Sequence, residues 1–255
     1  GSCLRSDARS RKRVGRQMTN NAVYENDSII CVTGETLRPG GFLLTERAIL
    51  ACGLEKNQRV LDVGCGMGAT VKFLRDDFQI EAFGIDPSEK LIKLGKDKYG
   101  LPLDIGKGEI LPYEDSSFDA VFTECTLSLM DSYERAIREI YRVLKPGGFF
   151  IAADVYARNP EYIDELKKTE VKSCLRNLFD LGTLLNKIDD KGFEISVLED
   201  WTSLLKKLMV EIIFEYGSMA EFWKVTTCGN CEDFKDKLTL CKPGYFLLIG
   251  EKEGE

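Results

Sequence analysis

The sequence predicts a doubly wound α/β domain with a mostly parallel sheet. Short apolar runs alternate with amphipathic stretches of helical length from residue 59 onward. A glycine-rich turn joins the first of these runs to the first amphipathic stretch. Hydrophobic residues make up 44% of the 255 residues and charged residues 30%, which is the balance of a globular chain. No apolar run approaches the ~18 residues of a membrane span, so we expect a soluble protein.

The N-terminal residues are expected to lie outside the sheet. Residues 1–17 hold six basic residues and one acidic residue, and we expect either a cloning remnant or a disordered basic arm. The net charge of the whole chain is −7 and that of this segment is +5, so the net charge of residues 18–255 is −12. That sign argues against a duplex-binding body, so no nucleic-acid partner is expected. Residues 19–53 are polar and rich in turns, and we expect them to form an N-terminal lid.

From residue 45 the chain divides into alternating elements. The first helix is expected to be capped by Thr45 and stopped by Gly53. The predicted strands span residues 59–63, 80–85, 103–106, 119–123, 149–154, 193–198 and 245–250. The predicted helices span residues 45–52, 69–77, 88–98, 131–144 and 203–216. The order Asp131-Ser132-Tyr133-Glu134 resembles a capping box, so Asp131 is expected to cap the fourth of these helices.

After residue 157 the alternation loosens, and a helical cap is expected. Residues 157–192 include two predicted helices, whereas residues 218–242 are expected to be irregular. These two insertions suit an enclosed binding site for a small molecule. No linker interrupts the chain, so residues 18–255 are expected to form one domain with a lid and a cap.

The sharpest motif is a glycine loop at residues 60–69, Val-Leu-Asp-Val-Gly-Cys-Gly-Met-Gly-Ala. Glycines let the backbone approach a ligand closely, and the N-terminus of the next helix favours an anionic group. Asp86 follows the second predicted strand, where a carboxylate can accept both hydroxyls of a ribose. The loop also fits the dinucleotide pattern G-x-G-x-x-A, and a tight turn without a ligand is a third interpretation. Asp62 favours a ligand that carries an ammonium group over one that carries a pyrophosphate.

Three segments resemble class I S-adenosylmethionine-dependent methyltransferases, nearest the ubiquinone-biosynthesis and arsenite methyltransferase group. Residues 61–68 resemble motif I, residues 111–119 resemble the adenine-side loop, and residues 142–148 resemble the turn into strand five. The resemblance covers residues 54–155. It implies a Rossmann-like, seven-stranded sheet with an antiparallel last strand. It also implies S-adenosylmethionine as the cofactor, with S-adenosylhomocysteine as its product.

The resemblance also implies roles for individual residues. Asp62 would help orient the ammonium group of the cofactor through water or a backbone group, Asp86 would bind the ribose, and Pro87 would lie beside the adenine. The residues implied at the methionine end are Gly64, Cys65, Gly66, Gly68, Thr123 and Glu124, and those at the adenine edge are Gly108 and Glu109. One position departs from the family, since Lys107 stands where an acid often contacts the adenine amine. A backbone group or Glu109 is expected to replace that acid.

Histidine is absent from the sequence, which excludes Ser-His-Asp and Cys-His catalysis and every His-ligated metal site. The candidate bases near the expected mouth of the site are Glu124, Asp154, Tyr156 and Asp131. Asp154 and Tyr156 end a predicted strand and have a structural alternative, which is to cap the next turn. Arg38 lies in a Pro-Gly turn of the expected lid and is a candidate partner for a carboxylate of the cofactor or the substrate, and a solvated arginine in a simple turn is the alternative.

Nine cysteines without a recognisable secretory signal indicate a reducing compartment, so a cytoplasmic protein is expected. Cys228 and Cys231 form a C-x-x-C turn and Cys241 follows ten residues on, a spacing that thiolate coordination of a soft ion allows. Cys174 also resembles in its placement a substrate-binding cysteine of arsenite methyltransferases. These four cysteines are a possible thiophilic site, and ordinary reduced thiols are the alternative.

Together these patterns predict methyl transfer from S-adenosylmethionine to a small-molecule acceptor by in-line displacement. One alternative is methylation of arsenic or another thiophilic acceptor that the cap cysteines hold. A second is a cofactor-binding accessory protein without turnover, and a dinucleotide oxidoreductase is a more distant one. The sequence identifies neither the acceptor atom nor the oligomeric state.

Overall fold

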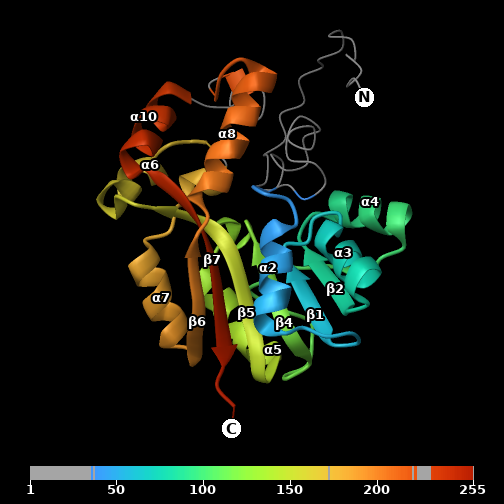
Figure 1. The fold of residues 1–255 in the computed structure, drawn as a ribbon. Coiled ribbons are helices and arrows are strands. Elements are labelled where there is room, and N and C mark those ends of the chain that lie inside the picture. Colours follow the sequence, from blue (N-terminus) through green and yellow to red (C-terminus); the bar gives the residue numbers. More distant parts are fainter. Residues whose placement is uncertain (1–35, 37, 172, 220, 223–230, 255) are drawn as a thin grey trace.

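The computed structural model describes residues 36, 38–171, 173–219, 221–222 and 231–254, and it contains one seven-stranded sheet (Figure 1). The strands are β1 (Arg59–Val63), β2 (Glu81–Asp86), β3 (Leu103–Ile105), β4 (Phe118–Glu124), β5 (Leu144–Ala157), β6 (Phe193–Asp200) and β7 (Pro243–Lys252). Their order across the sheet is β3-β2-β1-β4-β5-β7-β6. The five strands from β3 to β5 pair in parallel, and β7 runs antiparallel to both β5 and β6. The predicted seven-stranded sheet with an antiparallel last strand is confirmed.

Helices cover both faces of the sheet, as a doubly wound fold requires (Figure 1). The helices are α2 (Leu43–Cys52), α3 (Ala69–Phe78), α4 (Glu89–Tyr99), α5 (Tyr133–Val143), α6 (Ile163–Lys167), α7 (Leu181–Asp189), α8 (Thr202–Tyr216) and α10 (Cys231–Cys241). One apolar core holds side chains of α2, α3 and α4, and a second core on the other face holds side chains of α5 and α7. None of the described helices combines the length and the apolar composition needed to cross a membrane.

The order in which the chain adds strands to the sheet reverses at β1. This strand has β2 on one side and β4 on the other, both parallel to it. The loops that leave the carboxyl ends of β1 and β4 therefore run to opposite faces and leave a crevice between them. This crevice is where a ligand site is expected in an open parallel sheet. Residues that lie far apart in the sequence meet there because strand order does not follow chain order.

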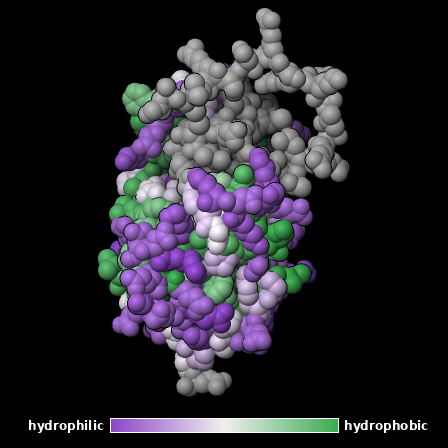
Figure 2. All heavy atoms as spheres, turned by 90° about the vertical axis from the view of Figure 1, so that its right-hand side faces the viewer, coloured by the Kyte–Doolittle hydropathy of each residue, from purple (hydrophilic) through white to green (hydrophobic). Residues whose placement is uncertain are grey.

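The outer surface over α3 and α4 is mainly hydrophilic, with scattered apolar side chains (Figure 2). Ion pairs one helical turn apart occur on both helices, between Lys72 and Asp76 and between Lys93 and Asp97. Such pairs stabilise an isolated helix by only about 0.3–0.5 kcal/mol each. The position of these helices is therefore determined by their buried faces, which pack on the sheet.

Two predicted helix caps were wrong. Helix α2 begins at Leu43, two residues before Thr45, and the buried Thr45 side chain bonds to Glu124 instead of capping the helix. Helix α5 is capped by Ser132, whose Oγ accepts a hydrogen bond from the Arg135 N–H, while Asp131 pairs with Lys107. The predicted stop at Gly53 is confirmed, with a left-handed φ of 58°.

The segment 218–242 was predicted to be irregular, and this was wrong for its second half. Residues 231–241 form α10, which places the buried side chains of Phe234 and Leu238 one turn apart on its inner face. α10 contacts α6, and both lie with α8 beyond one end of the sheet (Figure 1). α7 instead packs on the sheet, with Leu184 and Ile188 in the second core.

Candidate functional site

A cavity of about 550 Å³ lies beyond the carboxyl ends of β1, β2 and β4. This volume is within the range of pockets that hold drug-sized ligands. The lining comes from the lid, the glycine loop, the ends of β2 and β4, and the loops that follow β3 and β4. The residues with chemistry to offer are Arg38, Asp62, Cys65, Thr70, Asp86, Lys107, Glu109, Glu124, Cys125, Thr126 and Asp131.

The glycine loop forms one wall, and its conformation depends on the absence of side chains. Gly64, Gly66 and Gly68 all have left-handed φ angles, of 84°, 54° and 83°. A Cβ atom on Gly64 would lie 2.3 Å from Cγ2 of Thr126, which closes the turn from the β4 side. Gly68, which directly precedes α3, does not line the cavity because it packs against Leu101.

Asp86 is fixed at the end of β2 by backbone donors. Its Oδ2 accepts a hydrogen bond from the Gly66 N–H at 3.0 Å and its Oδ1 accepts one from the Ser88 N–H at 2.8 Å. These two bonds connect the glycine loop to the start of α4 and hold the carboxylate at the cavity wall. A carboxylate oxygen can accept more than one hydrogen bond, so these two bonds do not prevent contact with a ligand hydroxyl.

Asp62 is a buried acid that faces the cavity. It is 4% exposed, and it forms no hydrogen bond with any residue that the structure describes. The pKa of Asp62 is raised to about 8, chiefly by burial; the nearby charges of Glu124 and Asp86 contribute to the rise, and Arg38 opposes it. A cationic group in the cavity would stabilise the ionised carboxylate, so Asp62 is built to receive one.

Arg38 and helix α2 are joined to the sheet by a buried polar cluster, which we call the Arg38 cluster: Arg38, Thr45, Thr70 and Glu124. Arg38 lies 3.0 Å from Glu124 Oε2 and donates to the Thr70 and Thr45 hydroxyls at 2.9 and 2.7 Å. Thr45 and Thr70 donate in turn to the two Glu124 oxygens, at 2.8 and 3.1 Å. Every carboxylate oxygen of Glu124 is therefore engaged. This makes Glu124 a structural anchor and leaves it poorly suited to take a proton.

Two loops meet at the other end of the cavity, after β3 and after β4. Lys107 Nζ lies 2.8 Å from Asp131 Oδ2, and the Ser132 N–H donates to Glu109 Oε1 at 3.2 Å. Gly108 lies so close to Met130 that a Cβ atom there would be 2.8 Å from the Met130 methyl group. This end of the cavity is thus enclosed by two segments that the chain separates by about twenty residues.

Several predicted site residues do not line the cavity. Thr123 is fully buried in β4 and bonds to the Ile151 carbonyl. Asp154 is fully buried, and burial raises its pKa to about 6 although the Ser128 N–H, the Ser128 hydroxyl and the Val155 N–H all donate to it. Tyr156 donates to Asp200 at the rim of the sheet. Asp154 and Tyr156 are two residues apart on β5, so both project from one sheet face, and neither is part of the cavity lining.

The predicted thiophilic site is only partly covered by the structure. Cys228 lies outside the described residues, and so does the side chain of Cys231. Cys174 is partly exposed and Cys241 is buried. Within the described part of the chain, no group of three His, Cys, Asp or Glu residues has the geometry to hold a metal ion.

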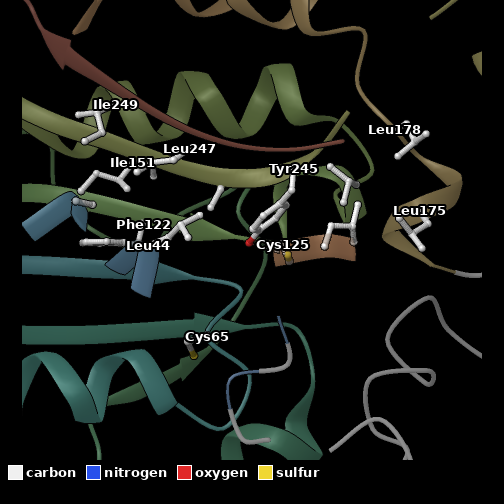
Figure 3. Close-up of a cluster of buried hydrophobic side chains, with 14 of the residues drawn as sticks. Leu44, Cys65, Phe122, Cys125, Ile151, Leu175, Leu178, Tyr245, Leu247 and Ile249 are labelled. Carbon is white, nitrogen blue, oxygen red and sulfur yellow. Dashed lines mark hydrogen bonds between the residues drawn. The ribbon is translucent and has the colours of Figure 1, made fainter. Parts of the chain in front are cut away.

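Cys125 lies in the cavity wall, a position that the sequence did not single out. It follows β4 with a left-handed φ of 57°, and its Sγ lies 3.3 Å from the Tyr245 hydroxyl (Figure 3). Burial raises the pKa of the Cys125 thiol well above its usual value, so it remains protonated at neutral pH. Thr45 and Thr70 were also missed. Their signal was a hydroxyl on an otherwise apolar helix face, beside Ala48 and Leu74.

Comparisons with known proteins agree with this site. Residues 61–152 match a family model described as a methyltransferase domain. A phosphoethanolamine N-methyltransferase of Triticum aestivum is 26% identical over 234 residues, which are 88% of this chain and 46% of that protein. An uncharacterized protein of Methanocaldococcus jannaschii is 28% identical over 183 residues, 69% of this chain and 70% of its own length. The chain spans less than half the length of the plant relatives it matches.

Solved structures share the fold. The [4+2]-cyclase SpnF is 27% identical, with a TM-score of 0.63 over 83% of this chain and 80% of that protein. Phosphoethanolamine N-methyltransferase 2 of Haemonchus contortus, in complex with phosphomonomethylethanolamine and S-adenosylhomocysteine, is 20% identical. Its TM-score is 0.69 over 92% of this chain and 58% of that protein. The match of residues 61–152 to a methyltransferase domain agrees with the predicted resemblance, and the nearer grouping with ubiquinone-biosynthesis and arsenite methyltransferases stays a prediction.

Proposed function

We propose that this chain transfers a methyl group from S-adenosylmethionine to a small-molecule acceptor. The observation that carries the proposal is the pair of acids in one cavity: Asp62 buried without a hydrogen-bonding partner among the described residues, and Asp86 fixed at the cavity wall by the Gly66 and Ser88 N–H groups. An ammonium group and a ribose are the two groups of this cofactor that such acids recognise.

The residues present fit the cofactor. Asp62 would accept the ammonium group, and its carboxylate, neutral below about pH 8, would ionise on binding. Asp86 would accept the two ribose hydroxyls, and Gly64 and Gly66 would let the backbone approach the methionine part closely. When bound, S-adenosylmethionine supplies a methyl group that its sulfonium already activates.

The chain's own contribution is to enclose and align the reactants. Transfer to a nucleophile with a free lone pair needs no base, so orientation and exclusion of water provide the rate gain. The Arg38 cluster supports the lid side of the cavity for this purpose. We assign no proton-transfer step to Asp154 or Tyr156, since neither lines the cavity.

The acceptor we propose carries no negative charge, and its nitrogen reacts as the unprotonated amine, which has a free lone pair. Arg38 and Lys107 are the cations that line the cavity among the described residues, and both are paired with carboxylates. The phosphoethanolamine N-methyltransferases among the relatives act, by their names, on a phosphorylated amine. We therefore expect an amine without a phosphate to be the better acceptor for this chain.

Calorimetric titration of the reduced, metal-free protein with S-adenosylmethionine and S-adenosylhomocysteine tests the cofactor. Micromolar binding of both ligands is expected, and no binding of either would overturn the proposal. Transfer of a labelled methyl group to ethanolamine, its N-methylated forms, phosphoethanolamine and arsenite then tests the acceptor.

The outcomes of the transfer assay separate the alternatives. Labelling of arsenite that is lost in Cys174→Ser would favour the thiophilic acceptor. Cofactor binding without transfer to any member of a broad panel would favour an accessory role. The fold permits such a divergence, since one solved relative is named as a [4+2]-cyclase.

A further inference from the structure

The end of the cavity far from Asp62 has its own recognition chemistry. Leu91, Pro87 and Met130 contribute apolar surface there, and Gly108 adds backbone without a side chain. Such a slot suits a flat heteroaromatic ring, which needs apolar contact on its faces and polar contact at its edge. The base of the cofactor must lie here, because Asp62 and Asp86 mark the positions of the ammonium group and the ribose.

Asp131 offers an open acceptor at the edge of this slot. Its Oδ2 is bound to Lys107 Nζ at 2.8 Å, while Oδ1 forms no hydrogen bond with any described residue. Glu109 is the rival acid, but its Oε1 already accepts the Ser132 N–H and thereby holds the two loops together. Asp86 is engaged by two backbone donors nearer the glycine loop.

We infer that Asp131 accepts a hydrogen bond from the exocyclic amine of the cofactor's adenine, and that Lys107 is the positioning residue that holds it there. Lys107 occupies the position where related enzymes often carry the acid that contacts this amine. The ion pair with Lys107 holds the Asp131 carboxylate at the cavity, although Asp131 belongs to the loop after β4. The inference rests on the proposed function and adds to it the residue that selects adenine.

The test compares two ligands that differ only at this group. S-adenosylhomocysteine has an amine at the purine edge, whereas its 6-deamino analogue, which has an unsubstituted purine as its base, carries only a hydrogen atom there. The ratio of the two dissociation constants, measured by calorimetry, isolates the proposed contact from the rest of the cofactor. For the unaltered chain we expect S-adenosylhomocysteine to bind at least about tenfold more tightly, as for loss of a charge-assisted hydrogen bond.

Substitutions show which residues cause the preference for S-adenosylhomocysteine. Asp131→Asn should lower the ratio, because a neutral amide oxygen accepts a weaker hydrogen bond from the amine than a carboxylate does. Lys107→Met should lower the ratio, and Lys107→Arg should restore it. Asp115→Asn is the matched control, since Asp115 is exposed and paired with Arg142 outside the cavity, and its ratio should equal that of the unaltered chain. Asp131 is also exposed, so thermal melting should show all variants folded.

Three results would overturn the inference. A ratio near one in the unaltered chain would mean that the amine is not recognised. An unchanged ratio in Asp131→Asn would remove Asp131 from recognition, and a ratio that falls only in Glu109→Gln would assign the contact to Glu109. In all three cases S-adenosylhomocysteine still binds, so the proposed function survives. Failure of the unaltered chain to bind S-adenosylhomocysteine would overturn both.

Discussion

Asp62 shows how a single residue connects the sequence to the chemistry of the site. A carboxylate at the end of a buried strand loses its hydration, and the structure gives it no compensating donor among the described residues. Its pKa rises from 3.8 to about 8 for that reason. The folded protein therefore retains a proton that the unfolded chain releases.

The first prediction concerns the stability of the unliganded protein against pH. Because the folded pKa of Asp62 is raised, its contribution favours folding below about pH 4 and is lost as the pH rises through 8. Asp62→Asn should remove this loss. At pH 9 the variant should therefore melt several degrees above the unaltered chain, whereas at pH 4 the two proteins should melt at similar temperatures. Differential scanning calorimetry across this range measures the difference, with Asp97→Asn as the exposed control. Parallel pH profiles for Asp62→Asn and the unaltered chain would contradict the raised pKa.

The second prediction concerns cofactor binding at the same residue. Asp62→Asn should weaken binding of S-adenosylhomocysteine by about 10- to 100-fold, the effect of losing a hydrogen bond to a charged group. Binding to the unaltered chain at pH 7 should release a proton, since the ligand's ammonium group favours ionised Asp62. Calorimetry in two buffers of different ionisation enthalpy measures this release. Binding without proton release would show that Asp62 stays neutral in the complex.

The third prediction concerns the buried ion pair of the Arg38 cluster. Arg38→Met should destabilise folding by about 3–5 kcal/mol, because it leaves Glu124 charged and buried. Combining it with Glu124→Gln should recover much of this loss, as a double-mutant cycle of denaturant unfolding would measure. Arg47→Ala breaks a half-exposed pair with Glu199 and should cost less than about 1 kcal/mol. Additive effects of the Arg38 and Glu124 substitutions would contradict the coupling.

At the scale of elements, the sequence was most informative where local pattern and packing agree. Strands β1, β2 and β4 were predicted within one residue of their observed bounds, since each is a short apolar run buried on both faces. Helix α10 was missed because its two terminal cysteines suggested a coordination site. Its helical character rests on tertiary burial of Phe234 and Leu238, which the local sequence signals weakly.

The fourth prediction concerns the glycine loop as an element. Gly64→Ala should destabilise the chain and weaken cofactor binding, because the new Cβ would lie 2.3 Å from Thr126 and φ is 84°. Gly100→Ala is the matched control, with a φ of 64° but no neighbouring atom within 4 Å. Its cost should be limited to about 1–2 kcal/mol of backbone strain. Equal effects of the two substitutions on cofactor affinity would contradict the close approach of the loop.

At the scale of the whole molecule, the site exists because the order of strands in the sheet reverses at β1. The sequence predicted Asp62, Asp86 and the glycines because they follow the ends of adjacent strands. It did not predict the contact of Thr45 with Glu124 or that of Asp131 with Lys107, since Thr45 was expected to be a helix cap and Asp131 a cap or a base. Those contacts join residues that are 79 and 24 positions apart, and no local pattern encodes such distances.

The central claim is that one cavity receives S-adenosylmethionine in a defined orientation. A crystal structure of the reduced protein with saturating S-adenosylhomocysteine tests this most directly. We predict density in the cavity with the ammonium group at Asp62, the ribose hydroxyls at Asp86 and the adenine beside Asp131. An empty cavity, or a ligand bound elsewhere or in the reverse orientation, would contradict the account.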